Sequence, residues 1–155
     1  MDSGYRDLIF YQKGQEVVRG VDLLIKTWPK SLQVQEISRQ LFRSAISVGA
    51  NIAEGHGRHQ GREYIHFLTI SQGSANEVDH WLHTALDCNL GREEEIIRLI
   101  QLNNEVRKML NATIKTLYTR QQSKSVRETP NPYSLNPYTP DSIVLDHSPL
   151  EESES

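Results

Sequence analysis

This chain of 155 residues contains one cysteine, Cys88, and only one proline, Pro29, before residue 130. A single cysteine excludes an intrachain disulfide, which suits a reducing compartment. The sequence also lacks a run of about 18 apolar residues, so we expect no membrane-spanning segment. Its N-terminus has neither the basic start nor the apolar stretch of a signal peptide. From these absences we expect a cytoplasmic protein.

The sequence also lacks the strong positive charge that would by itself indicate nucleic-acid binding. Its formal net charge is −3, and the charge is unevenly distributed. Residues 1–122 contain 15 Lys and Arg against 14 Asp and Glu, whereas residues 123–155 contain 2 against 6. The first part is therefore close to neutral, and the last part is acidic.

Sequence motifs for catalysis are absent as well. There is no Walker loop, no dinucleotide fingerprint and no recognisable pairing of a nucleophile with a base. The glycines at positions 55, 57 and 61 separate two expected helices and follow no strand. They therefore predict a turn rather than a phosphate-binding loop, and we expect neither enzymatic activity nor a cofactor.

Two Glu-x-x-His units raise the alternative of a metal centre. They are Glu63 with His66 and Glu77 with His80. Di-iron helical bundles use such units on two different helices. Here both units fall on one expected helix, about 21 Å apart by helical rise. Because one centre cannot be shared over that distance, we expect solvated surface pairs and no bound metal.

Apolar residues recur at spacings of three and four, which predicts four amphipathic helices. The expected helices span about residues 6–27, 34–54, 61–88 and 93–118. Pro29 ends the first helix, Gly55 and Gly57 end the second, and Gly91 belongs to the break before the fourth. Short connections make neighbouring helices antiparallel. The predicted fold class is all-α, an antiparallel up-down-up-down four-helix bundle over residues 5–120.

From residue 123 onwards the composition changes. Five of the six prolines lie in this part, and Asn-Pro-Tyr occurs twice, at 131–133 and 136–138. Such a segment cannot bury enough apolar surface to offset the entropy lost on ordering. We therefore expect residues 123–155 to form a Pro-rich, acidic, disordered tail. The alternative is that Ile143-Val144-Leu145 and the Asn-Pro-Tyr units dock on a partner or a neighbouring subunit.

A line of polar residues runs beside the apolar face of the second expected helix, and a matching set lies on the third. Buried or half-buried polar groups normally need hydrogen-bond partners. We therefore expect a hydrogen-bonded seam between the two helices that fixes their register. The alternative is a recognition surface. The seam residues are Gln40, Ser47, Asn51, Glu54, Ser74 and Glu77.

The run QLFRSAISVGANIAEG at residues 40–55, followed by Gly-Ser-x-x-Glu at 73–77, resembles the signature of the bacterial 23S rRNA intervening-sequence protein family. The resemblance covers about residues 5–120. One departure is Val48-Gly49, where relatives often carry Ile-Pro. The retroelement accessory protein Avd is a more distant relative. The resemblance implies the four-helix bundle and a closed ring of five subunits. Outward-facing Ile46, Ala50 and Ile65 suit such self-association.

Basic residues gather at two places in the expected topology. The turn between the second and third helices shares one end of the bundle with the end of the fourth helix, and a basic pair lies on the outer face of the second. Such side chains can contact phosphates. The alternative is a solvated surface of salt bridges. The candidate contacts with RNA or a partner are Arg39, Arg43, Arg58, Arg62, Lys115 and Arg120.

The resemblance implies a function without catalysis. Avd binds a reverse transcriptase and its template RNA in a diversity-generating retroelement. We therefore expect a homopentameric adaptor that binds RNA, a nucleic-acid enzyme such as a reverse transcriptase, or both. The alternative is a protein–protein scaffold with no nucleic-acid role, in which the acidic tail recruits the partner.

Overall fold

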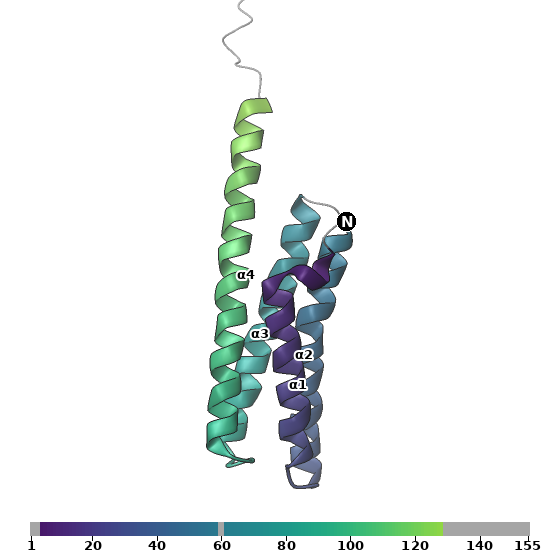
Figure 1. Ribbon diagram of the computed structural model, residues 1–155, viewed down its shortest axis with the longest axis vertical. Helices are drawn as coiled ribbons and strands as arrows, with labels where there is room; N and C mark the ends of the chain where they lie inside the picture. Colours follow the sequence, from purple (N-terminus) through teal and green to yellow (C-terminus); the bar gives the residue numbers. More distant parts are fainter. Residues whose placement is uncertain (1–3, 59–60, 129–155) are drawn as a thin grey trace, which may run out of the picture.

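The computed structural model describes residues 4–58 and 61–128, and within them all regular secondary structure is helical. The expected tail beyond Glu128 lies outside the described residues. The elements are η1 (Tyr5–Asp7), α1 (Ile9–Lys26), α2 (Leu32–Gly57), α3 (Arg62–Asp87) and α4 (Glu93–Glu128). Each helix packs on its neighbours in the chain, and α1 closes the bundle by packing on α4. Figure 1 shows the chain running up and down, which confirms the predicted topology.

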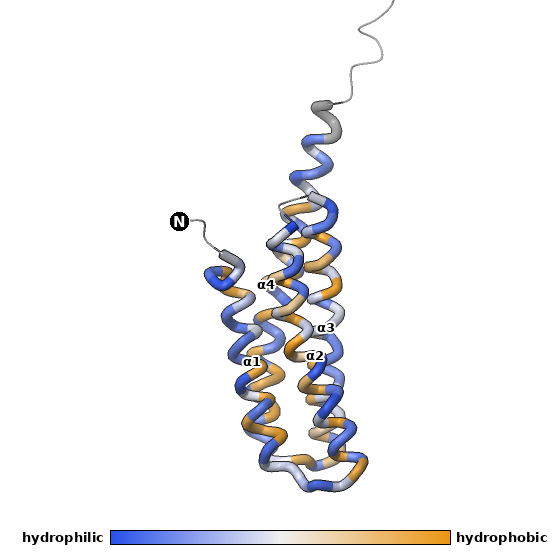
Figure 2. The backbone as a smooth tube through the Cα atoms, turned by 90° about the vertical axis from the view of Figure 1, so that its right-hand side faces the viewer, coloured by the Kyte–Doolittle hydropathy of each residue, from blue (hydrophilic) through white to orange (hydrophobic). Residues whose placement is uncertain are grey.

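The core lies along the bundle axis and contains the apolar faces that the helical spacing predicts. Val21, Leu41, Leu68 and Leu110, one from each helix, are fully buried. Complete burial of such side chains contributes about 1.5–3 kcal/mol each. Figure 2 shows that apolar and polar residues alternate along every helix of the bundle. None of the helices in the described ranges is both long enough and apolar enough to cross a membrane.

The end of α2 differs from the prediction, because Gly55 and Gly57 lie inside the helix rather than after it. Gly55 is buried, and a Cβ atom there would come within 2.8 Å of the Phe67 Cβ. The missing side chain therefore lets α3 approach α2 closely. The positive φ angle that favours glycine occurs later, at Gly61, with a φ of 110°. A helical glycine that allows close packing cannot be distinguished from a terminator by sequence spacing alone.

The predicted break between α3 and α4 is confirmed. Asn89 and Gly91 have positive φ angles of 53° and 75°. Leu90 between them is buried, so the turn is held against the core. A Cβ at Gly91 would also come within 2.8 Å of the Trp28 Nε1. Both the backbone conformation and the lack of space require glycine at position 91.

Helix α4 continues for ten residues beyond its predicted end at Tyr118 and includes the first six residues of the predicted tail. Residues 119–128 contain no glycine or proline and include several good helix formers. Extending an established helix costs far less than starting one. The side chains of Gln72 and Asn111 are hydrogen-bonded, which places the start of α3 level with about residue 121. Figure 1 shows the last turns of α4 extending past the other helices.

The predicted outward residues divide into two groups. Ile46 is 45% exposed and Ala50 is exposed, as expected. The prediction for Ile65 was wrong, because this side chain is only 3% exposed. Ile65 precedes Leu68 by three residues and shares its face of the helix. The apolar residue that α3 exposes is instead Ile70, at 39%.

Candidate functional site

Three of the six predicted seam residues come together between α2 and α3. The hydroxyl oxygens of Ser47 and Ser74 lie 2.9 Å apart. The Asn51 Nδ2 donates to the backbone carbonyl of Ser47 at 2.8 Å and lies 3.1 Å from its hydroxyl oxygen. This cluster satisfies polar groups that are wholly or half buried, so it serves the packing of the two helices.

A second serine extends the contact between the same helices. Ser71 is fully buried and donates its hydroxyl to the backbone carbonyl of Val48 on α2, at 2.9 Å. Ser44 is also buried, and its hydroxyl lies 2.7 Å from the carbonyl oxygen of Gln40 in its own helix. The α2–α3 interface is therefore small and polar at its centre, which fixes the register of the two helices.

The other three seam residues do not join this contact. The Gln40 Nε2 donates to Glu36 within α2 at 2.8 Å. Glu54 pairs with Arg58, and Glu77 is exposed on α3. Glu54 and Glu77 are exposed because they lie farther from the apolar stripe of their helix than Ser47 and Ser74 do. Gln40 shares the face of Ser47 and is half-buried, but its amide is used within α2.

Two of the six candidate basic residues form ion pairs with carboxylates of their own helix. Arg39 pairs with Glu36, and Arg58 pairs with Glu54, each at 2.7 Å. The hydrogen bonds that Arg39 donates to Glu36 and Arg58 donates to Glu54 raise the pKa of each arginine, and the bond from Arg39 lowers the pKa of Glu36. The Arg58 guanidinium also lies 5.8 Å from the Phe67 ring centroid. Such exposed pairs stabilise the helix only slightly.

The remaining four candidates are available for a ligand. Arg43, Arg62, Lys115 and Arg120 are all exposed. Among the side chains that the structure describes, those of residues 4–58 and 61–124, none of them forms an ion pair or a side-chain hydrogen bond. Arg62, Lys115 and Arg120 approach the same end of the bundle, whereas Arg43 lies partway along α2.

Helix α4 carries a long stretch of basic residues that was not predicted from the sequence, which we call the basic run. Residues 106–127 contain six basic residues and no Asp or Glu. The six are Arg107, Lys108, Lys115, Arg120, Lys124 and Arg127. The absence of acidic residues between Glu105 and Glu128 could have revealed it, but the expected tail boundary at residue 123 divided the run in two. Lys108, Lys115, Arg120 and Lys124 are exposed.

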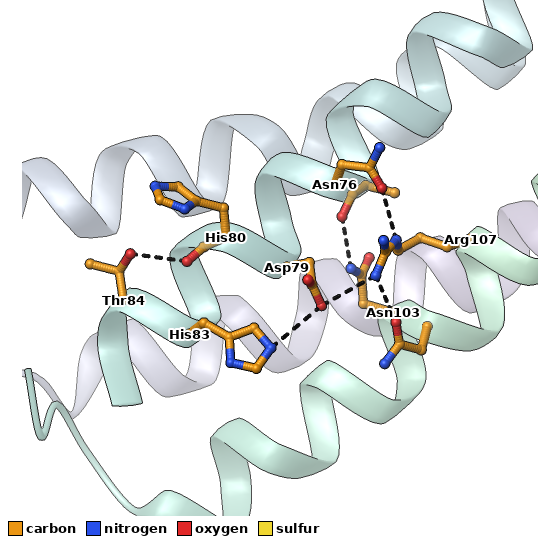
Figure 3. Close-up of polar contacts among 9 residues, drawn as sticks. Asn76, Asp79, His80, His83, Thr84, Asn103 and Arg107 are labelled. Carbon is orange, nitrogen blue, oxygen red and sulfur yellow. Dashed lines mark hydrogen bonds and ion pairs between the residues drawn. The ribbon is translucent and has the colours of Figure 1, made fainter. Parts of the chain in front are cut away.

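One member of the basic run, Arg107, forms polar contacts between α3 and α4 (Figure 3). Its Nε donates to the Asn76 Oδ1 on α3, and its Nη1 donates to the Asn104 Oδ1, both at 2.8 Å. The same Nη1 lies 3.5 Å from an Asp79 oxygen. One turn earlier, buried Asn103 donates to the carbonyl of Ala75 at 2.8 Å. Arg107 therefore holds α4 against α3 and is not available for a ligand.

The residues considered for metal binding lie apart on the surface of α3. Glu63, His66, Glu77 and His80 are all exposed. Over the described parts of the chain, no three His, Cys, Asp or Glu side chains are grouped so that they could hold a metal ion. A two-residue set on one exposed helical face is a poor ligand set for a transition metal.

The fold and sequence have known counterparts. A family model described as 23S rRNA-intervening sequence protein matches residues 6–112. Among solved structures, one similar chain is a protein of unknown function from the S23 ribosomal protein family of Bacteroides thetaiotaomicron. It shares 28% sequence identity over 69% of this chain and 99% of that chain, with a TM-score of 0.60. No curated protein matches the chain.

Proposed function

This chain belongs to the 23S rRNA-intervening sequence protein family, and from that premise we propose that it is a non-catalytic, homo-oligomeric adaptor that binds RNA. The observation that carries the proposal is the basic run of α4. It concentrates positive charge on one helix of a chain whose net charge is −3. Neutralising phosphates and releasing their counterions is the main source of sequence-independent affinity for nucleic acid.

The available charges support contact with a phosphate backbone. Lys108, Lys115, Arg120 and Lys124 are exposed on α4, and Arg62 lies at the start of α3, near the same end of the bundle. The acidic residues of α4 nearest to these side chains, Glu105 and Glu128, flank the basic run, and none lies between them to compete for Lys115 and Arg120. A surface of this kind would bind RNA with little sequence preference, because phosphate contacts carry no base information.

Exposed apolar side chains support the oligomeric part of the proposal. Ile9 is 63% exposed, Leu23 is 67% exposed and Leu32 is 79% exposed. Leu23 lines a groove of about 520 Å³ between α1 and α4. Single exposed apolar residues are ordinary, but several on one small bundle favour contact between copies. A ring would present several copies of the basic run to one RNA and raise its apparent affinity.

The proposed adaptor also has a protein partner, a nucleic-acid enzyme such as a reverse transcriptase. An adaptor needs a second binding surface that the RNA leaves free. The outer face of α2, with Ile46 and Ala50 exposed beside Arg43, is a candidate for it. A stable complex of a co-expressed reverse transcriptase with the wild-type chain, lost on Ile46→Glu, would support this part of the proposal.

The test is size-exclusion chromatography with light scattering, combined with the ratio of absorbance at 260 and 280 nm. The test variant reverses the charge of Arg62, Lys115, Arg120 and Lys124. A matched control reverses four exposed basic residues at the opposite end of the bundle, namely Lys26, Lys30, Arg92 and Arg98. We expect an oligomer whose RNA is lost in the test variant and kept in the control. RNA-free wild-type protein, or equal loss in both variants, would reject the RNA-binding role and favour a protein scaffold.

A further inference from the structure

The charges of the last third of the chain are separated into two blocks. The basic run, residues 106–127, contains six basic residues and no acidic ones. Residues 129–155, which we call the acidic segment, contain five acidic residues and no Lys or Arg. The five are Asp141, Asp146, Glu151, Glu152 and Glu154. The positive block and the negative block are electrostatically complementary and attract each other.

The exposed side chains of the basic run lie where an extended peptide can reach them. Arg120 and Lys124 are four residues apart and therefore share one face of α4. The start of α3 is level with about residue 121, so none of the other helices that the structure describes lies beside the last turns of α4. Lys108 and Lys115 are seven residues apart and share a second exposed face.

The length of the connection allows this contact within one chain. Asp141 follows Glu128 by 13 residues, and Lys115 precedes Glu128 by the same number. Thirteen helical residues span about 20 Å. A flexible chain of 13 residues spans about 20 Å on average, and a proline-extended one spans up to about 40 Å. The carboxylates can therefore reach Lys124, Arg120 and Lys115 of their own protomer.

We propose that the acidic segment folds back onto the exposed side chains of the basic run and competes there with RNA. The contact itself does not depend on RNA, whereas the competition rests on the proposed function. Because the segment is tethered, its local concentration at α4 is in the millimolar range, so even weak ion pairing is effective. Only an RNA that brings several phosphates to these basic side chains at once would then displace the acidic segment.

The first experiment detects the contact without RNA, in the full-length chain. A donor dye is attached to exposed Cys88, which lies beyond the end of α3, and an acceptor to the C-terminal residue. Labelled protein is diluted with unlabelled protein, so that transfer within one protomer is measured. Folding back shortens the path, because Cys88 lies five residues before the start of α4 and the acidic segment follows its last residue, Glu128. We expect energy transfer to fall as salt rises from about 0.05 M to 0.5 M.

The decisive comparison uses two variants of the acidic segment. In the first, all five carboxylates become amides, Asp→Asn and Glu→Gln. In the matched control, the serines at 142, 148, 153 and 155 become alanine, which leaves the charge unchanged. At low salt the amide variant should lose transfer and the control should keep it. Equal transfer in wild type and amide variant, with no effect of salt, would overturn the contact.

The second experiment separates this inference from the proposed function. Fluorescence anisotropy with a labelled single-stranded RNA of about 20 nucleotides measures the dissociation constants of the same variants. We expect the amide variant to bind roughly three- to tenfold more tightly than wild type, with no change in the control. If transfer shows the contact but no variant binds RNA, the proposed function fails and the contact stands. If RNA binds equally to all variants, the competition is wrong.

Discussion

The hydroxyl oxygens of Ser47 on α2 and Ser74 on α3 lie 2.9 Å apart, and Asn51 donates to the Ser47 backbone carbonyl from one turn away. This is the closest polar link between α2 and α3 among the predicted seam residues. It joins two parts of the chain that carry the family resemblance, the run at 40–55 and the Gly-Ser-x-x-Glu at 73–77. In this structure those residues serve helix packing.

A double-mutant cycle tests that role. Ser47→Ala and Ser74→Ala should each lower the free energy of unfolding by about 0.5–1.5 kcal/mol, because each removes a hydrogen bond from a buried or half-buried site. The double variant should lose less than the sum, with a coupling of about 0.5–1 kcal/mol. Urea unfolding followed by circular dichroism gives all four values. Strict additivity would mean that the two hydroxyls do not interact.

Two of the helical glycines, Gly55 on α2 and Gly73 on α3, should respond to alanine in opposite directions. A Cβ at Gly55 would meet the Phe67 Cβ at 2.8 Å, whereas nothing lies within 4 Å of a Cβ at Gly73. Gly55→Ala should therefore cost about 1–3 kcal/mol through overpacking. Gly73→Ala should stabilise the protein by about 0.5–1 kcal/mol, because alanine loses less backbone entropy in a helix. Thermal unfolding of the two variants compares them, and a stabilising Gly55→Ala would contradict the close contact.

The contribution of Arg107 to the free energy of unfolding should depend on the shape of its guanidinium group and not only on its positive charge. It donates to Asn76 and Asn104 from two different nitrogens, a geometry that an ammonium group cannot reproduce. Arg107→Lys should lower the free energy of unfolding by about 1 kcal/mol. The matched control is Arg98→Lys, an exposed position on the same helix where the change should be close to zero. Equal effects at both positions in chemical denaturation would rule out this role for Arg107.

Tyr64 should weaken the fold at high pH. Its side chain is half-buried beside Gly55, and burial raises the pKa of the phenol above its usual value of 10.0. The folded state therefore favours the neutral phenol. This contribution is fully present below pH about 10 and is lost as the pH rises through the folded pKa. In Tyr64→Phe, the decline of unfolding free energy between about pH 9 and pH 12 should be shallower. An unchanged slope would mean that Tyr64 ionises freely in the folded protein.

The number, order and direction of the helices could be predicted because their apolar spacing is regular. The family resemblance read from residues 40–55 is likewise confirmed by the match over 6–112. The helix ends were less predictable. Gly55 has the residue type of a terminator, but the tight contact with Phe67 explains it instead. Ile65 was expected to face outward, but it shares the face of Leu68 and is buried.

The candidate site could be predicted only in part, for a physical reason. Spacing shows which residues share a face but not which charges find partners, and Arg39 and Arg58 proved to be paired within their own helix. The same limit applies to the seam, where Gln40 bonds within α2 while Ser74 reaches across to Ser47. The extension of α4 to Glu128 joined charges that the expected tail boundary had separated.

Because α4 extends to Glu128, we predict that a chain cut after Glu128 and a chain cut after Gln122 will bind RNA differently. Deleting residues 129–155 removes five acidic residues and no Lys or Arg, which leaves a net charge of +2. Deleting residues 123–155 also removes Lys124 and Arg127, which leaves a net charge of +1. Both products keep every residue of the buried core, whose last member is Ile114. Their melting temperatures should therefore be similar.

The two truncated proteins differ by only one unit of net charge, so a difference in RNA affinity must come from the last turns of α4. We expect the chain ending at Glu128 to bind RNA more tightly than full-length protein, because a competing polyanion is gone. The chain ending at Gln122 should bind less tightly than the one ending at Glu128, by roughly tenfold at low salt, because it lacks the two positive charges of Lys124 and Arg127. It should also show a salt slope shallower by about two. Anisotropy titrations at three salt concentrations measure both quantities. Equal affinities and slopes for the two truncations would show that the end of α4 does not contact RNA and would move the interface to the lysines at 108 and 115.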